Sequence, residues 1–109
     1  MYTYKAKVLE VYDGDTITVE IDLGFTSHRI EKLRLYGIDT PEIRGPQKED
    51  GKKVRDIVRD AVLGKEVTIE TIKDGKGKFG RYLANVILPS GVNLNEWLVN
   101  EGHAKEYMK

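Results

Sequence analysis

Residues 4–21 read Tyr-Lys-Ala-Lys-Val-Leu-Glu-Val-Tyr-Asp-Gly-Asp-Thr-Ile-Thr-Val-Glu-Ile. Apolar and polar residues alternate on either side of Asp13-Gly14-Asp15, and this period of two predicts two half-buried strands joined by a turn. Gly24 ends the second strand, and a third strand is predicted over residues 28–36. The chain therefore begins as β structure with one apolar face.

The periodicity changes in the middle of the chain. Glycine and proline interrupt residues 37–50, which predicts a loop, and loops this long in small domains are often functional. From residue 51 the apolar residues recur at the spacing of an amphipathic helix, which Gly64 ends as a C-terminal cap. The apolar face of this helix consists of Val54, Ile57, Val58, Ala61 and Val62.

The last third of the chain returns to β structure before a second helix. Strands are predicted over residues 67–72 and 82–88, on either side of a basic segment over residues 73–80. Asn93-Leu-Asn-Glu96 has the capping pattern that opens a helix, and Gly102 ends it. The predicted order is thus three strands, a helix, two strands and a helix.

This order is that of an OB-fold, a small barrel that commonly presents an oligonucleotide-binding face. The 109 residues match the usual size of one domain. We therefore predict a β-rich α+β fold, a five-stranded OB-fold barrel with two helices, as a single domain over residues 1–109.

Composition excludes several classes of function. Eighteen Lys and Arg balance eighteen Asp and Glu, so a nucleic acid or an anionic membrane would have to bind a local basic patch. The lack of cysteine excludes disulfide scaffolds, thiolate zinc sites and cysteine nucleophiles. The sequence contains neither a membrane-spanning apolar run nor a signal-peptide pattern. We therefore expect a cytoplasmic protein, or a secreted one if a signal has been removed.

Three motif-like features fail on their context. Gly75–Gly80 matches G-x-G-x-x-G, but a dinucleotide-binding fingerprint must open a helix, and here a strand follows. Asp13-Gly14-Asp15 resembles the start of an EF-hand loop, yet the third ligand position would fall on Ile17. The two histidines, His28 and His103, have no partner at ligand spacing and are expected at the surface.

Carboxylates and arginines occur where the predicted strands begin or end. They are Asp13 and Asp15 in the first turn, Arg34 on the third strand, Asp39 and Glu42 in the loop after it, and Arg81 at the start of the fifth strand. Singly, each has a structural explanation, because Asp caps turns and surface Arg is usually solvated. A barrel brings these regions together, however. Hard oxygen ligands there suit Ca²⁺ or Mg²⁺, a further carboxylate can act on water, and two guanidinium groups can bind phosphate.

Four blocks of the sequence resemble, in order, the signatures of the staphylococcal nuclease (thermonuclease) family. They are Val11-Tyr-Asp-Gly-Asp-Thr16, Arg34-Leu-Tyr-Gly-Ile-Asp-Thr-Pro-Glu42, Lys78-Phe-Gly-Arg-Tyr-Leu-Ala84 and Leu94-Asn-Glu-Trp-Leu-Val-Asn-Glu-Gly102. The blocks extend over nearly the whole chain. The resemblance implies an OB-fold nuclease that uses one Ca²⁺ ion to hydrolyse phosphodiester bonds in DNA and/or RNA by metal-assisted attack of water.

The resemblance also assigns roles to individual residues. The metal ligands are Asp15, Asp39 and the backbone carbonyl of Thr40, with Asp13 farther from the ion. The catalytic residues are Glu42, in the position of the proposed general base, and Arg34 and Arg81, in the two phosphate-binding positions.

The basic segment before the fifth strand is the candidate substrate-binding strip. Lys76 and Lys78 lie in it beside Arg81, although such a charged run can equally be a solvated loop. Phe79 replaces a family tyrosine that touches a terminal phosphate, so that hydroxyl contact is missing. The expected partner is single-stranded DNA or RNA, without a membrane, and the chain is expected to be a monomer.

The alternative is a non-catalytic OB-fold module that binds nucleic acid or protein. Such modules typically lose the metal-binding acids and the arginines. This chain retains the complete set, which favours the enzyme: Asp15, Arg34, Asp39, Glu42 and Arg81.

Overall fold

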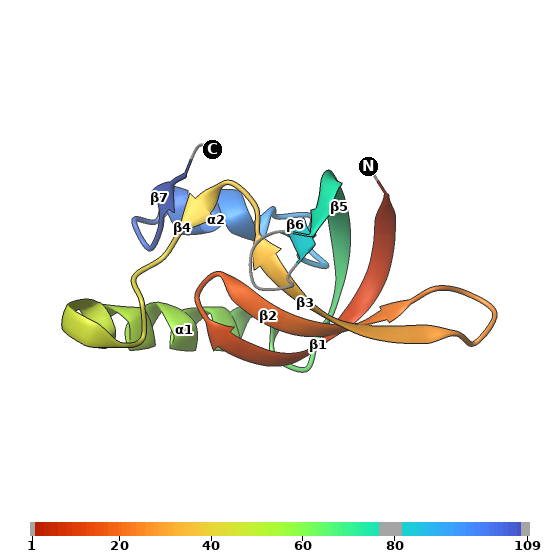
Figure 1. Ribbon diagram of the computed structural model, residues 1–109, viewed down its shortest axis with the longest axis horizontal. Coiled ribbons are helices and arrows are strands. Elements are labelled where there is room, and N and C mark those ends of the chain that lie inside the picture. The colour runs from red at the N-terminus through yellow and green to blue at the C-terminus, as the bar shows by residue number, and fades with distance from the viewer. Residues whose placement is uncertain (1, 77–81, 108–109) are drawn as a thin grey trace.

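The computed structural model describes residues 2–76 and 82–107, with the side chains of residues 2–72 and 82–107. Five strands form a closed barrel in the order β1-β2-β3-β6-β5 (Figure 1). The β3–β6 pair is parallel and the other pairs are antiparallel. The strands are β1 (Thr3–Asp13), β2 (Thr16–Asp22), β3 (His28–Leu35), β5 (Glu66–Lys76) and β6 (Tyr82–Ile87). The predicted five-stranded barrel with two helices is confirmed.

A bulge in β1 explains an irregular spacing in the sequence. Ala6 and Val8 alternate into the core, and strict alternation would bring Glu10 in next. The register with β2 shifts between Val8 and Glu10, so that one extra residue enters β1 and Val11 is buried instead. A second shift precedes the β1–β2 turn, where Asp13 and Asp15 lie.

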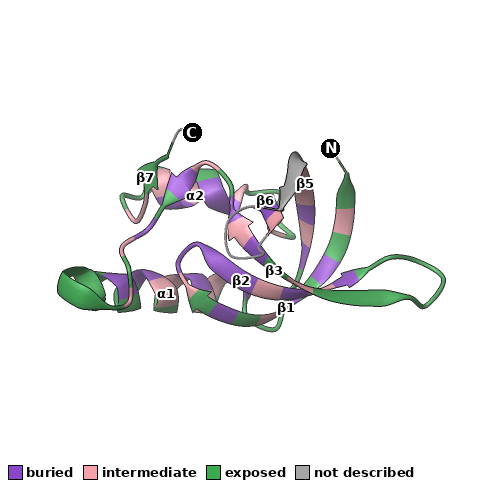
Figure 2. Cartoon of the chain, viewed as in Figure 1, coloured by how far each residue is buried: buried purple, intermediate pink, exposed green. Residues whose placement is uncertain are grey.

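Two helices cover the barrel and complete its core (Figure 2). Helix α1 (Lys48–Val62) runs beside β1 and buries Val54, Val58 and Val62. Helix α2 (Leu94–Asn100) lies against β6 and buries Leu94 and Leu98. Its predicted cap is present, because the Asn93 side chain accepts the Glu96 N–H at 3.2 Å.

Some predicted boundaries are wrong. Helix α1 begins at Lys48 rather than residue 51, directly after a 3₁₀ turn (η1, Gly45–Gln47), because its first turn is polar and gives no apolar signal. Strand β5 continues to Lys76, into the segment predicted as a loop. The structure also contains a two-stranded sheet of β4 (Ile38–Asp39) and β7 (Lys105–Glu106), which is too short to show any periodicity.

The surface prediction for the histidines holds for only one of them. His28 is exposed, whereas His103 is half-buried with its ring centroid 5.7 Å from that of Trp97. Neither helix of the described chain is long and apolar enough to cross a membrane.

Candidate active site

The end of β3 lies beside the turn between β1 and β2. Thr16 of β2 and Arg34 of β3 are register partners. The Leu35 N–H donates to the Asp15 carbonyl at 2.8 Å, which holds the strand end against the turn. Antiparallel pairing therefore places Asp15 next to Arg34, although 19 positions separate them in the sequence.

The Arg34 guanidinium joins the two acids that were predicted to bind metal. Its Nη2 lies 3.5 Å from Asp15 Oδ2 and 3.5 Å from Asp39 Oδ1. Its Nη1 donates to the carbonyls of Leu35 and Ile38, both at 3.0 Å. One side chain thus fixes the β3–β4 turn and holds Asp15 and Asp39 on the same side of that turn.

The two carboxylates differ in environment. Asp15 is 6% exposed, and its oxygens accept the Thr40 N–H at 3.2 Å and the Thr16 hydroxyl at 3.4 Å. The Asp39 side chain is 57% exposed. Asp15 is therefore a fixed acid at the bottom of the site, and Asp39 is an open acid at its rim.

Asp13 is a third carboxylate in the same turn. Its Oδ1 accepts the Asp15 N–H at 3.1 Å. Burial and, to a smaller extent, the hydrogen bond and charge of the neighbouring Asp15 carboxyl together raise the pKa of Asp13 to about 7. With this pKa, the Asp13 carboxyl changes between its protonated and ionised forms near neutral pH.

Two glycines let helix α1 approach the site closely. A Cβ on Gly14 would lie 2.6 Å from Val54 Cγ1 and 2.9 Å from Thr40 Oγ1. A Cβ on Gly51 would lie 2.0 Å from the Glu42 carbonyl oxygen. Because glycine has no Cβ, Thr40 can lie against Gly14 and the Glu42 backbone can lie against Gly51.

Tyr107 is a site residue that the sequence did not indicate. Strand β7 pairs with β4, and the Tyr107 N–H donates to the Gly37 carbonyl at 2.8 Å. The Arg34 Cζ lies 5.7 Å from the centre of the Tyr107 ring, within the range of a cation–π contact. A tyrosine after a two-residue strand carries no periodic signal, so only the tertiary structure reveals it.

Sequence comparison identifies the family. A sequence model of the family described as "Staphylococcal nuclease homologue" matches residues 32–109. The chain belongs to the staphylococcal nuclease family. That match includes Arg34, Asp39 and Glu42, whereas Asp15 lies before it.

Relatives named as nucleases support the same grouping. An uncharacterized endonuclease of Escherichia coli is 35% identical over 102 residues, which cover 93% of this chain and 60% of the relative. A thermonuclease of Staphylococcus hyicus is 36% identical over 102 residues, 91% of this chain and 57% of the relative. Endonuclease YhcR of Bacillus subtilis is 33% identical over 113 residues, 95% of this chain and 9% of the relative. The chain thus spans about 60% or less of each of these nucleases.

The residues that the staphylococcal nuclease resemblance selected fall into two groups. Asp15, Arg34, Asp39 and Thr40 are brought together. The Glu42 side chain is exposed and, within the part of the chain that the structure describes, makes no hydrogen bond or ion pair. No group of three or more acidic or histidine side chains at metal-binding distances occurs in the described residues.

The remaining selected residues precede β6 in the sequence. Arg81, Lys78 and Phe79 lie outside the described residues, as does the side chain of Lys76. Strand β6 begins with Tyr82 paired to Leu33, the residue before Arg34. The predicted meeting of these two strand ends is therefore confirmed for the backbone.

Proposed function

We propose that this chain is a Ca²⁺-dependent nuclease that hydrolyses phosphodiester bonds of single-stranded DNA or RNA. The single observation that carries the proposal is the Arg34 guanidinium lying between the buried Asp15 and the open Asp39. The endonucleases and the thermonuclease among its relatives support the same chemistry.

The chemistry of the donors fits Ca²⁺. Asp15 and Asp39 offer carboxylate oxygens close to a single nitrogen, and Thr40, whose N–H already holds Asp15, offers a backbone carbonyl. The Thr40 hydroxyl is buried and, among the described atoms, lacks a hydrogen-bond partner. The site therefore contains a buried oxygen that could also face an ion. Ca²⁺ takes six to eight oxygen ligands, and water and the substrate phosphate would supply the others.

Each protein group then has a defined task. When bound, Ca²⁺ supplies Lewis acidity toward a phosphoryl oxygen and a nearby water. Arg34 keeps Nη1 on its two backbone carbonyls and offers Nη2 to a phosphate oxygen. The present 3.5 Å contacts of Nη2 are longer than the usual charge-assisted hydrogen bonds of about 2.7–2.9 Å. A well-placed donor of this kind contributes roughly 3 kcal/mol to transition-state stabilisation.

The other catalytic and substrate-binding assignments remain predictions from the family resemblance and from the basic run in the sequence. Glu42 accepts a proton from the attacking water or orients that water, and its exposed carboxylate is free to do so. Arg81 provides the second guanidinium for the phosphate. Lys76, Lys78 and Phe79 contact the nucleic acid beside this site.

A cleavage assay tests the proposal. The full chain is incubated with a fluorescent single-stranded DNA oligomer and its RNA counterpart in Ca²⁺ and then in chelator. We expect cleavage only in Ca²⁺. We also expect Asp39→Asn to weaken Ca²⁺ binding in a calorimetric titration by at least about tenfold, because one carboxylate ligand is lost. Asp60→Asn, at an exposed position on α1, is the matched control.

Two results would reject parts of the proposal. A pure preparation that binds the oligomer without Ca²⁺-dependent cleavage would be a non-catalytic binding module. An unchanged Ca²⁺ titration for Asp39→Asn would remove Asp39 from the metal site.

A further inference from the structure

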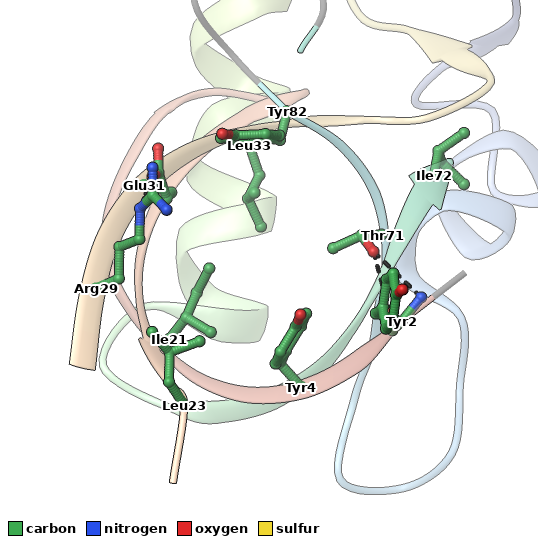
Figure 3. A pocket seen from close by; sticks show the side chains of 10 residues that line it. All are labelled: Tyr2, Tyr4, Ile21, Leu23, Arg29, Glu31, Leu33, Thr71, Ile72 and Tyr82. Carbon is green, nitrogen blue, oxygen red and sulfur yellow. Dashed lines mark hydrogen bonds and ion pairs between the residues drawn. The ribbon is translucent and has the colours of Figure 1, made fainter. Parts of the chain in front are cut away.

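A cavity lies within the ring of barrel strands, and the proposed chemistry does not use it (Figure 3). Its volume is about 300 Å³, and all five barrel strands contribute to its lining. That volume is at the lower end of the range for small-ligand pockets, which suits a ligand of one ring system.

The lining of the cavity is aromatic and aliphatic. Three tyrosines, Tyr2, Tyr4 and Tyr82, lie around it, and Ile21 and Leu33 are buried in its wall. Tyr2 is 71% exposed, so its ring is open to an incoming group.

The polar groups of the cavity carry no net charge. Arg29 and Glu31 form an ion pair in its wall, from alternate positions of β3. The pair offers donors and an acceptor side by side but no unbalanced positive charge. Such a lining favours a flat, uncharged ring with polar edges over a phosphate group.

The strand register connects this cavity to the candidate active site. Leu33 lines the cavity, and the next residue, Arg34, holds Asp15 and Asp39. Neighbouring residues of a strand point to opposite faces, so the two sites lie on opposite sides of the end of β3. Tyr82, at the start of β6, pairs with Leu33 and also lines the cavity.

We propose that this cavity binds an unpaired nucleobase of the substrate strand, close to the phosphate that is cleaved. The base stacks on the tyrosine rings, and the Arg29–Glu31 pair meets its hydrogen-bonding edge. The inference rests on the proposed nuclease function and gives it a physical basis for selecting single strands. A paired and stacked base cannot enter a cavity inside the barrel, whereas an unpaired base can.

Binding without cleavage tests this inference. Fluorescence anisotropy in chelator measures the Kd of labelled thymidine oligomers of two and eight nucleotides, and of an eight-unit abasic oligomer. The variants are Tyr2→Ala, at an exposed position, and Tyr4→Leu, which keeps apolar volume. Tyr12→Ala is the matched control, because Tyr12 lies on β1 like Tyr4, is 53% exposed and lines no part of the cavity. Circular dichroism checks that each variant is folded.

We expect the eight-nucleotide oligomer to bind more tightly than both the dinucleotide and the abasic oligomer. Tyr2→Ala and Tyr4→Leu should each weaken binding of the eight-nucleotide oligomer by at least about fivefold, the low end of base–aromatic stacking. The same variants should leave binding of the abasic oligomer unchanged, because it has no base to stack, and Tyr12→Ala should leave the Kd of both eight-unit oligomers unchanged.

Three outcomes would overturn the inference. If the wild type cleaves DNA and the folded tyrosine variants bind all oligomers like the wild type, the cavity binds no base, although the nuclease proposal stands. If Tyr2→Ala changes only the sedimentation of the protein, the cavity holds a second copy of the chain instead. If the wild type neither binds nor cleaves any oligomer, both proposals fail together.

Discussion

Replacement of Gly51 by alanine should displace Glu42 while the protein remains folded. The new Cβ would lie 2.0 Å from the Glu42 carbonyl oxygen, 2.4 Å from its carbonyl carbon and 2.8 Å from the Ile43 nitrogen. These are backbone atoms, so no rotamer change relieves the overlap. An ordinary contact begins at 3.4 Å, so the loop or the helix must move by more than about 1 Å.

The expected effects on stability and turnover differ in size. Overpacking costs about 1–3 kcal/mol, and alanine in place of glycine inside a helix contributes about 1 kcal/mol in the opposite direction. The net loss is therefore about 0–2 kcal/mol, and the melting temperature should fall by at most about 15 °C. A displacement of 1 Å in a catalytic group can lower the rate about 100-fold. Gly51→Ala should thus remain folded and lose most of its activity.

The assay combines initial cleavage rates in saturating Ca²⁺ with thermal unfolding followed by circular dichroism. Lys53→Ala is the control, because Lys53 is exposed on the same helix and its replacement should change neither quantity much. A folded Gly51→Ala protein that cleaves at a rate within about threefold of the wild type would refute the reasoning. The Glu42 backbone would then tolerate the displacement, or Glu42 would not take part in turnover.

Substitutions at three further positions probe the site. The folded-state pKa of Asp13, about 7, exceeds its ordinary value of 3.8, so the folded state favours the protonated acid. In chelator, the melting temperature of the wild type should therefore fall as pH rises from about 4 to about 7, and Asp13→Asn should lose this trend. Arg34→Lys should lower turnover at least about 100-fold and destabilise the fold by about 1–3 kcal/mol, measured by urea unfolding. Lysine has a single side-chain nitrogen, so it cannot hold the two carbonyls, as Nη1 does, and also face Asp15 and Asp39, as Nη2 does. Tyr107→Leu should lower turnover only about two- to fivefold, and Tyr107→Phe should retain it, because a cation–π contact contributes about 0.5–1 kcal/mol; equal rates for Leu and Phe would exclude the ring from any role.

The sequence was sufficient for the barrel because the barrel depends on local periodicity. The alternating residues of β1 and β2 and the helical spacing of Val54, Val58 and Val62 correspond to buried faces in the structure. The bulge is also visible in the sequence. The buried residues Val8 and Val11 are three positions apart, whereas a regular strand would bury residues an even number of positions apart. Hydrophobic burial provides most of the driving force for folding, so this pattern identifies the major elements.

The geometry of the site was less accessible from the sequence. Strands β4 and β7 are two residues long, and they pair residues more than 60 positions apart without any periodic pattern. Asp15 is buried because the tertiary fold surrounds it and brings the Thr40 N–H to its carboxylate, whereas Asp39 is exposed. The sequence alone does not show this difference. The role of Gly51 appears only when the helix and the Glu42 loop are seen in contact.

The position of the Arg34 guanidinium between the two acids has a consequence for the proposed binding of an ion. Asp15 and Asp39 repel one another when both are ionised, and the guanidinium between them offsets that repulsion. A cation that binds the two acids therefore competes with Arg34 Nη2. A substrate phosphate removes the competition, because it gives Nη2 a new anionic partner while Nη1 stays on the Leu35 and Ile38 carbonyls. Ion and phosphate should consequently strengthen each other's binding by the same factor, as linkage requires, and the complete site should form only when both are present.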